Sequence, residues 1–288
     1  MNKIQVYTDT ASDNLEALIN EGVKIVPLYI SFDGVNSLKQ NVEISLPEFY
    51  ERMRAPHDKH PKTSLASIQD YYDLFEEDLK DGKDVLYICM NGKMSSTLGA
   101  ANNAKAMLEE DYPNSKVCVV DSTTVTYGMY HLAKIANDMA KENKSIEEIA
   151  NKLDEVKPTI KYFFTVETLD YLRDGGRIGG ATALLGGVLN IKPVMLIEDG
   201  EIKPISKVRG RNKSLESIKE ELKKELEGKD INDYELVVLE GDIVEEANEF
   251  KNELVKELNV SDIPVCKLGI SIGLHAGPGT MGLGIMHK

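Results

Sequence analysis

The chain has 288 residues, of which 42% are hydrophobic, enough to bury the core of one large or two modest domains. It carries 34 Lys and Arg against 48 Asp and Glu, a net charge of −14. This balance argues against nucleic acid as a partner, because phosphate contacts depend on basic side chains. The longest uncharged stretch, between Arg177 and Lys192, is short and interrupted by glycines, so we expect no membrane insertion.

The three cysteines, Cys89, Cys118 and Cys266, lie far apart in apolar, strand-like segments. An odd number without C-x-x-C spacing indicates buried thiols and not disulfides or zinc ligands. The amino terminus runs directly into a strand pattern at Ile4, without the features of a secretion signal. We therefore expect a cytoplasmic protein that uses no metal and no organic cofactor.

The first half of the chain alternates strand and helix patterns. Apolar strand patterns cover residues 4–7, 24–32, 85–90 and 117–120. Helical patterns cover residues 14–20, 45–54, 67–79, 97–109 and 125–141. Strands that alternate with helices form right-handed βαβ units around a mostly parallel sheet. The sequence therefore predicts an N-terminal α/β domain, which we assign to residues 1–157.

A polar, charged stretch at residues 141–158 marks the predicted boundary to a second domain, residues 158–288. Strand patterns cover residues 162–166, 188–197, 202–208, 234–239 and 265–270, and helical patterns cover 169–173, 213–227 and 244–258. Asp199–Gly200 between two strand patterns is a strong hairpin signal. We predict a second α/β domain with a mixed sheet, and a ligand between or beneath the two domains.

Hydroxyl side chains follow three of the predicted N-terminal strands, at Asp9–Thr10, at residues 95–97 and at residues 121–124, and Thr63–Ser64 precedes another helix. Ligands of parallel sheets bind beyond the carboxyl ends of the strands, where helix N-termini also favour negative charge. This clustering predicts a site for a small anionic group. The alternative is that each hydroxyl only caps its helix.

Several short motifs do not predict the chemistry they suggest. Residues 269–273 match G-x-S-x-G, but no acidic residue follows to complete a hydrolase triad with His275. Residues 277–282 match G-x-G-x-x-G, but too little chain follows for the βαβ unit of a dinucleotide site. His57 and His60 lie in a polar loop without further metal ligands, and no P-loop motif is present.

One segment concentrates positive charge. Five basic residues and no acid lie between Lys203 and Lys213, including Lys207, Arg209 and Arg211. A solvent-exposed hairpin arm is one interpretation of this strip. The other is a docking surface for an acidic partner, whose approach these charges would steer.

The most specific signal is a series of motifs in fixed order: residues 168–178 with Gly-Gly-Arg-Ile at the end, residues 189–193, Asp199–Gly200, residues 207–209, and His275-Ala-Gly-Pro-Gly279. In this series, and in the early stretch at residues 8–13, the chain resembles the DegV family over nearly its whole length. These are bacterial fatty-acid-binding proteins that act as the lipid-carrying subunit of a fatty acid kinase. The resemblance implies a long-chain fatty acid as ligand and a kinase catalytic subunit as partner.

The resemblance also implies the residues that hold the carboxylate. By position in the family motifs these are Thr63 and Ser95, with Arg177 and His275 close by and with Ser64 and Ser96 as neighbouring hydroxyls. No catalytic residue is implied, since the partner would bring ATP and transfer the phosphoryl group. The alternative is an enzyme, a hydrolase or transferase that acts on a small carboxylate through Ser95 or His275.

A fatty acid tail requires a long apolar slot. The glycine-spaced segment after Arg177 supplies our candidates for its wall, which are Ile178, Leu184, Leu185, Val188, Leu189 and Ile191. Glycines allow a segment to approach a ligand closely. The alternative is that these side chains belong to an ordinary core between two layers.

Overall fold

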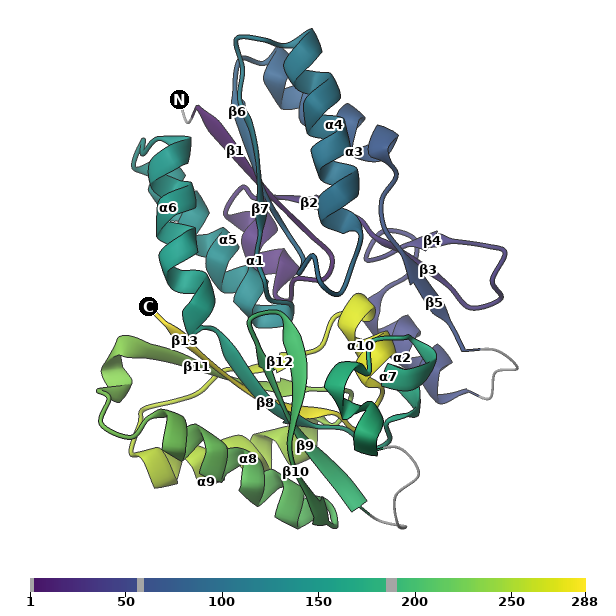
Figure 1. Ribbon diagram of the computed structural model, residues 1–288, viewed down its shortest axis with the longest axis vertical. Coiled ribbons are helices and arrows are strands. Elements are labelled where there is room, and N and C mark those ends of the chain that lie inside the picture. The colour runs from purple at the N-terminus through teal and green to yellow at the C-terminus, as the bar shows by residue number, and fades with distance from the viewer. Residues whose placement is uncertain (1–2, 56–59, 185–190) are drawn as a thin grey trace.

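The computed structural model describes residues 3–55, 60–184 and 191–288. Its first half contains a four-stranded, fully parallel sheet in the order β2-β1-β6-β7 (Figure 1). Its strands are β1 (Ile4–Asp9), β2 (Lys24–Val26), β6 (Asp84–Cys89) and β7 (Val117–Asp121). The predicted α/β character and parallel pairing of this half are confirmed.

Helices cover both faces of this sheet. They are α1 (Leu15–Asn20), α3 (Ile68–Lys80), α4 (Thr97–Asp111), α5 (Thr126–Lys141) and α6 (Ile146–Val156). Tyr7 and Tyr87 point to the face packed by α3 and α4, whereas Val6 and Leu86 point to the face packed by α5 and α6. Capping boxes begin α3 and α6, where Ser67 and Ser145 exchange hydrogen bonds with the third helical residue.

The predicted strand at residues 24–32 is wrong as a single element. Pro27 lacks a backbone N–H, and the chain leaves the parallel sheet after β2. It enters a second, three-stranded sheet in the order β4-β3-β5, with β3 (Tyr29–Ser31), β4 (Leu38–Lys39) and β5 (Lys62–Ser64). Helix α2 (Leu46–Arg54) packs nearby, and Thr63, for which we predicted no strand, lies on β5 opposite Ile30.

The second half contains a six-stranded mixed sheet in the order β10-β9-β8-β13-β11-β12. Its strands are β8 (Lys161–Thr165), β9 (Ile191–Glu198), β10 (Glu201–Arg209), β11 (Tyr234–Glu240), β12 (Val265–Lys267) and β13 (Met281–His287). The hairpin at Asp199–Gly200 is confirmed, with both residues at positive φ (52° and 74°), as its tight turn requires.

Two long helices, α8 (Arg211–Glu225) and α9 (Val244–Leu258), cover one face of the mixed sheet, and the other face turns toward α5. Short helices complete this half: α7 (Asp170–Asp174), α10 (Ile270–Ala276) and the 3-10 segments η1 (Lys157–Thr159), η2 (Gly179–Leu184) and η3 (Ile231–Asp233). Helix α5 therefore lies between the two main sheets, and α10 reaches over to α2 and β5 (Figure 1). Within the described ranges, no helix combines the length and the apolar character needed to cross a membrane.

Candidate functional site

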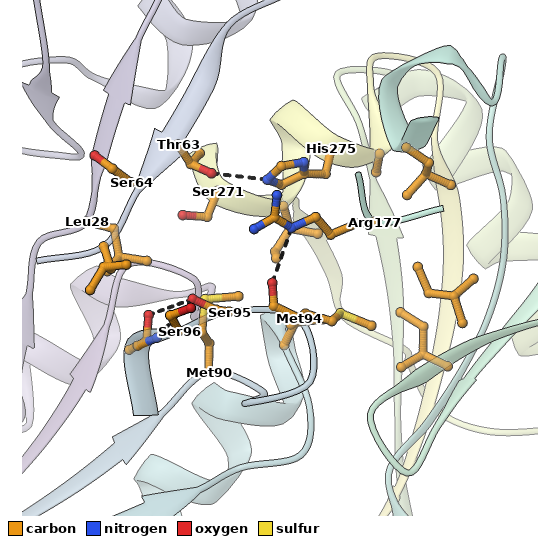
Figure 2. A pocket seen from close by; sticks show the side chains of 18 of the residues that line it. Leu28, Thr63, Ser64, Met90, Met94, Ser95, Ser96, Arg177, Ser271 and His275 are labelled. Carbon is orange, nitrogen blue, oxygen red and sulfur yellow. Dashed lines mark hydrogen bonds between the residues drawn. The ribbon is translucent and has the colours of Figure 1, made fainter. Parts of the chain in front are cut away.

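A cavity opens where the carboxyl ends of the parallel strands meet α10. Its empty space, counted together with the solvent at its open mouth, is about 860 Å³. All six residues expected at the carboxylate line it: Thr63, Ser64, Ser95, Ser96, Arg177 and His275. Figure 2 shows Thr63 and Ser95 entering from N-terminal elements, and Arg177 and His275 from C-terminal ones.

Thr63 and His275 form the central polar contact. Strand pairing places Thr63 on β5, helix α10 carries His275, and His275 Nε2 lies 3.1 Å from Thr63 Oγ1. The other ring nitrogen, Nδ1, is buried and has no hydrogen-bond partner in the described part of the chain. Because a buried N–H without an acceptor is rarer than a bare acceptor, we assign the ring proton to Nε2. Thr63 then accepts from His275 and keeps its own proton for a ligand.

The charge state of His275 follows from its surroundings. Burial lowers its pKa to about 4, with further contributions from the charges of Arg177 and His60. The imidazole is therefore neutral at neutral pH. A Cβ at Gly175 would lie 2.1 Å from His275 Nδ1, so the glycine leaves the space that the ring occupies.

Ser95 and Ser96 directly precede helix α4. Ser95 Oγ lies 2.7 Å from Thr97 Oγ1 and accepts a hydrogen bond from the Thr97 backbone N–H. Ser96 precedes the helix, but its side chain makes no capping hydrogen bond, which leaves its exposed hydroxyl available to a ligand. The backbone N–H groups of the first turn of α4 add partial positive charge beside these hydroxyls.

Arg177 stands at the rim of the cavity. Its Nε donates to the carbonyl of Met94 (3.2 Å) and its Nη1 to the carbonyl of Gly175, so backbone oxygens fix the guanidinium in place (Figure 2). Both acceptors are neutral, and the positive charge remains available to an anion at the cavity mouth.

The other hydroxyl clusters that we expected at this edge hold loops together instead. Asp9 accepts from Tyr87 and from the backbone of Met90 and Ala11, and Thr10 donates to Gln40. At residues 121–124 the Ser122 and Thr124 side chains bond within their own loop. For these positions the interpretation as structural polar groups holds, and they are absent from the lining of the cavity.

Ser271 of the G-x-S-x-G match also lines the cavity, but its hydroxyl donates to Gln40 Oε1 (2.9 Å). Thr10 donates to the same oxygen (3.0 Å), and Gln40 Nε2 donates to the carbonyl of Tyr29 (3.1 Å). Gln40 is fully buried. This network joins β1, the small sheet and α10, and it makes Ser271 a structural residue.

The interior of the cavity is apolar. Its lining includes Leu28, Met90, Val125, Phe164, Ile197 and Ile272. Two patterns in the sequence pointed to these residues, and we missed both. Met90 and Val125 follow strands β6 and β7, and Ile272 shares the face of α10 with His275 and Ala276 at helical spacing.

The expected tail wall stays a prediction, and its described positions do not line the cavity directly. Ile178 and Leu184 pack against a cluster that includes Leu172 and Ile202, and Ile191 begins β9; the lining of the cavity includes none of the three. The segment that carries them packs beside β10, behind the cavity lining. Leu185, Val188 and Leu189 lie outside the described residues.

The basic strip at residues 203–213 contains both ion-paired and exposed side chains. Arg211 forms a two-bond ion pair with Glu246, and Lys203 pairs with Glu198, so these charges are compensated within the chain. Lys207 and Arg209 are exposed on the edge strand β10. Of the expected docking residues, Arg211 is therefore placed in a structural role.

The polar loop at residues 56–61 is described only from His60 onward. His60 lies beside Tyr171, with ring centroids 5.7 Å apart, and His57 lies outside the described residues. Within residues 3–55, 60–184 and 191–288, no cluster of three or more His, Cys, Asp or Glu side chains has the arrangement of a metal site.

Residues 3–288 match a family model described as an uncharacterised protein of the DegV family. The chain belongs to the DegV family. A DegV domain-containing protein of Caldanaerobacter subterraneus subsp. tengcongensis is 36% identical over 284 residues, which cover 98% of each chain. A second relative, a DegV domain-containing protein of Clostridium perfringens, is 31% identical over 284 residues. The match covers 98% of this DegV chain and 96% of the relative's chain.

Solved structures of other proteins superpose on this DegV chain along nearly its full length. A fat acid (stearic acid)-binding protein from Eubacterium ventriosum has 34% identity and a TM-score of 0.93, with 99% of this chain and 98% of that chain covered. A DegV family protein from Thermus thermophilus, described by its fatty acid binding, has 29% identity and a TM-score of 0.85, with 99% and 100% covered. The predicted α/β fold is confirmed by these likenesses.

In this DegV protein a single cavity has a polar part and an apolar part. At the mouth, hydroxyl groups, a neutral imidazole and a guanidinium offer hydrogen-bond donors to an anion. Behind them the lining changes to aliphatic and aromatic side chains. Such a cavity suits a ligand with a small charged head and a long apolar body.

Proposed function

We propose that this protein binds a long-chain fatty acid, with the carboxylate at Thr63, Ser95 and His275 and the tail in the apolar cavity. The observation that carries the proposal is the continuity of one cavity from a cluster of hydrogen-bond donors into the apolar interior. The stearic-acid-binding relative from Eubacterium ventriosum, with its TM-score of 0.93, supports the same ligand class.

The energetics suit this ligand. A carboxylate taken from water needs donors to replace its hydration, and charge-assisted hydrogen bonds contribute about 1.5–3 kcal/mol each. Each buried methylene adds about 0.8 kcal/mol, so a long tail supplies the larger share of the affinity. The head-group donors then set orientation, and the tail sets binding strength.

We further propose that the chain acts as a carrier, and that a separate kinase subunit phosphorylates the bound carboxylate. The alternative, catalysis by Ser95 or His275, requires a nucleophile hydrogen-bonded to its base. Here Ser95 bonds to Thr97, whereas His275 bonds to Thr63. This separation favours the carrier, which turns over nothing without its partner.

Native mass spectrometry with lipid extraction tests the ligand. We expect the purified protein to carry about one fatty acid per chain, and the double variant Thr63→Ala, Ser95→Ala to lose most of it, because both replaced side chains donate to the carboxylate. Ser37→Ala, at an exposed loop position, is the matched control and should retain the lipid. Full occupancy in the double variant would contradict the assigned head-group site.

The docking of the kinase is tested at Arg209. This residue lies at the end of β10 that is opposite to the Asp199–Gly200 turn, roughly 25 Å along the strand, so a partner at Arg209 and at the cavity mouth would span the hairpin. We expect Arg209→Glu to reduce acyl-phosphate formation with the purified kinase subunit and ATP while lipid binding is kept. Lys256→Glu, exposed on α9, is the control of equal charge change. Equal kinase rates for the two variants would remove Arg209 from the interface.

A further inference from the structure

A second, smaller chamber adjoins the deep end of the cavity. Its empty space, counted together with the space open to solvent, is about 360 Å³, and its lining is apolar. The chamber and the main cavity share five lining residues: Val125, Phe164, Ile197, Ile272 and Ala276. The two spaces are therefore adjacent, and a tail that continues inward from the head-group site would reach the chamber beside these side chains.

The floor of the chamber is β13, an inner strand of the mixed sheet, at a place where the strand lacks side chains. Along β13, Met281, Leu283 and Ile285 face the core beneath α8 and α9, so the alternate residues face α5. Two of these are Gly282 and Gly284. The strand thus presents no side chain at two successive positions on the face that turns toward the ligand.

The two glycines differ in what covers them. A Cβ at Gly284 would lie 2.8 Å from the ring of Tyr162, so that position is already filled. A Cβ at Gly282 would have as its nearest neighbours Leu239 Cβ (3.3 Å) and Phe164 Cβ (3.5 Å), which belong to the paired residues on β11 and β8. The nearest atoms are therefore beside Gly282 and not above it, and the space above it is the chamber.

The far wall of the chamber is held rigidly. The hydroxyl of Tyr162 donates to the carbonyl of Val125 (3.0 Å) and accepts from the backbone N–H of Gly128. These bonds fix the Tyr162 ring against the start of α5. A tail that reaches this ring has no further room unless the fold itself moves.

We infer that the chamber over Gly282 receives the methyl end of the acyl tail and sets the longest straight chain that the protein accepts. This inference rests on the proposed function, and it assigns chain-length selection to one backbone position on β13. Each methylene that finds room in the chamber raises affinity about fourfold, and each one excluded forfeits that gain.

The test compares the affinities of the delipidated protein for myristic and stearic acid. We expect Gly282→Ala to lower the stearic-to-myristic affinity ratio by about fourfold or more, because the added methyl group takes the place of a terminal methylene. Gly99→Ala, exposed on α4 with no atom near the new Cβ, is the matched control and should leave the ratio unchanged. An unchanged ratio in Gly282→Ala would overturn the inference.

A reciprocal variant keeps the test decisive should Gly282→Ala not fold. Leu239→Val removes one methylene from the side wall of the chamber. We expect this variant to raise the affinity for arachidic acid relative to that for stearic acid. An unaltered arachidic-to-stearic ratio would contradict the assignment of the chamber to the end of the tail. Failure of the proposed function gives a different result, since the wild-type protein would then bind neither myristic nor stearic acid.

Discussion

The protonation of one side chain decides how the head-group site behaves. His275 is neutral because burial lowers its pKa. Its Nε2–H donates to a lone pair of the Thr63 hydroxyl, so the Thr63 proton points away from the imidazole. A protonated imidazole would need an acceptor for Nδ1, which has none in the described residues. Under the proposed function, His275 and Thr63 are therefore neutral donors to the carboxylate, and Arg177 supplies the positive charge.

This protonation state predicts a pH dependence of stability. The pKa of His275 falls from an ordinary 6.5 to about 4 in the folded protein. Between these values the unfolded chain binds more protons, so the contribution of His275 to the free energy of unfolding is present above pH 6.5 and is lost as pH falls toward 4. Denaturant unfolding at several pH values should show a smaller loss of stability in His275→Gln than in the wild-type protein.

The exposed His287→Gln is the control for this measurement, and it should follow the wild-type curve. If His275→Gln loses as much stability as the wild-type protein between pH 7 and pH 4, the neutral, buried imidazole is refuted.

At the scale of elements, the cavity depends on segments that meet through Gln40. Its side chain accepts from Thr10 after β1 and from Ser271 on α10, and donates to Tyr29 on β3. Two hydroxyls and a carbonyl are thus satisfied by one buried amide. Since an unsatisfied buried polar group costs about 1–3 kcal/mol, these elements are held in register more strongly than their small contact areas suggest.

We expect Gln40→Ala to lower the free energy of unfolding by about 2–4 kcal/mol, because it leaves both hydroxyls without their acceptor and opens a void. Fatty acid affinity should fall as well, since α10 carries His275 and Ile272 into the cavity. Chemical denaturation and lipid titration measure the two effects. Gln69→Ala, exposed on α3, serves as control, and equal stability of the two variants would show that the network is dispensable.

The elements also show what the sequence could predict. The parallel sheet and the β9–β10 hairpin follow from apolar runs and from the turn at Asp199–Gly200. Strands β5 and β13 were missed for physical reasons. Lys62-Thr-Ser64 has no apolar alternation and pairs only because β3 offers an edge, and β13 carries glycines where a strand pattern needs side chains.

The cavity lining was easier to predict at its polar end than at its apolar end. The six residues that the family resemblance implied for the carboxylate all line one cavity. The tail wall could not be read in the same way. Its residues come from β8, β9, α5 and α10, and a core side chain and a ligand-lining side chain look alike until packing leaves a void between them.

At the scale of the whole molecule, the two halves meet around a buried carboxylate. Asp13, in the loop after β1, accepts from the backbone N–H of Gly269 (2.9 Å) at the start of α10. Its second oxygen is buried without a partner in the described part of the chain, and burial raises its pKa to about 7. The contact between the halves is therefore sensitive to protonation.

The sign of this effect is opposite to that of His275. Because the folded protein holds the Asp13 proton up to about pH 7, the contribution of Asp13 to stability is present at low pH and is lost as pH rises through 7. Asp13→Asn keeps an acceptor for Gly269 and removes the titration. Relative to the wild-type protein it should gain stability between pH 5 and pH 8 in denaturant unfolding, whereas Asp81→Asn at an exposed position should not. A difference between Asp13→Asn and wild type that does not vary with pH would contradict this assignment.

The position of β13 in the mixed sheet has a consequence for biosynthesis. It joins β8 to β11, yet it is made after every other strand of that sheet. During translation the facing edges of β8 and β11 stay unpaired until β13 emerges. The pocket gains His275 with α10 and then Gly282 with β13. The pocket is therefore complete only after residues 275–287 have been synthesised and β13 has paired with β8 and β11.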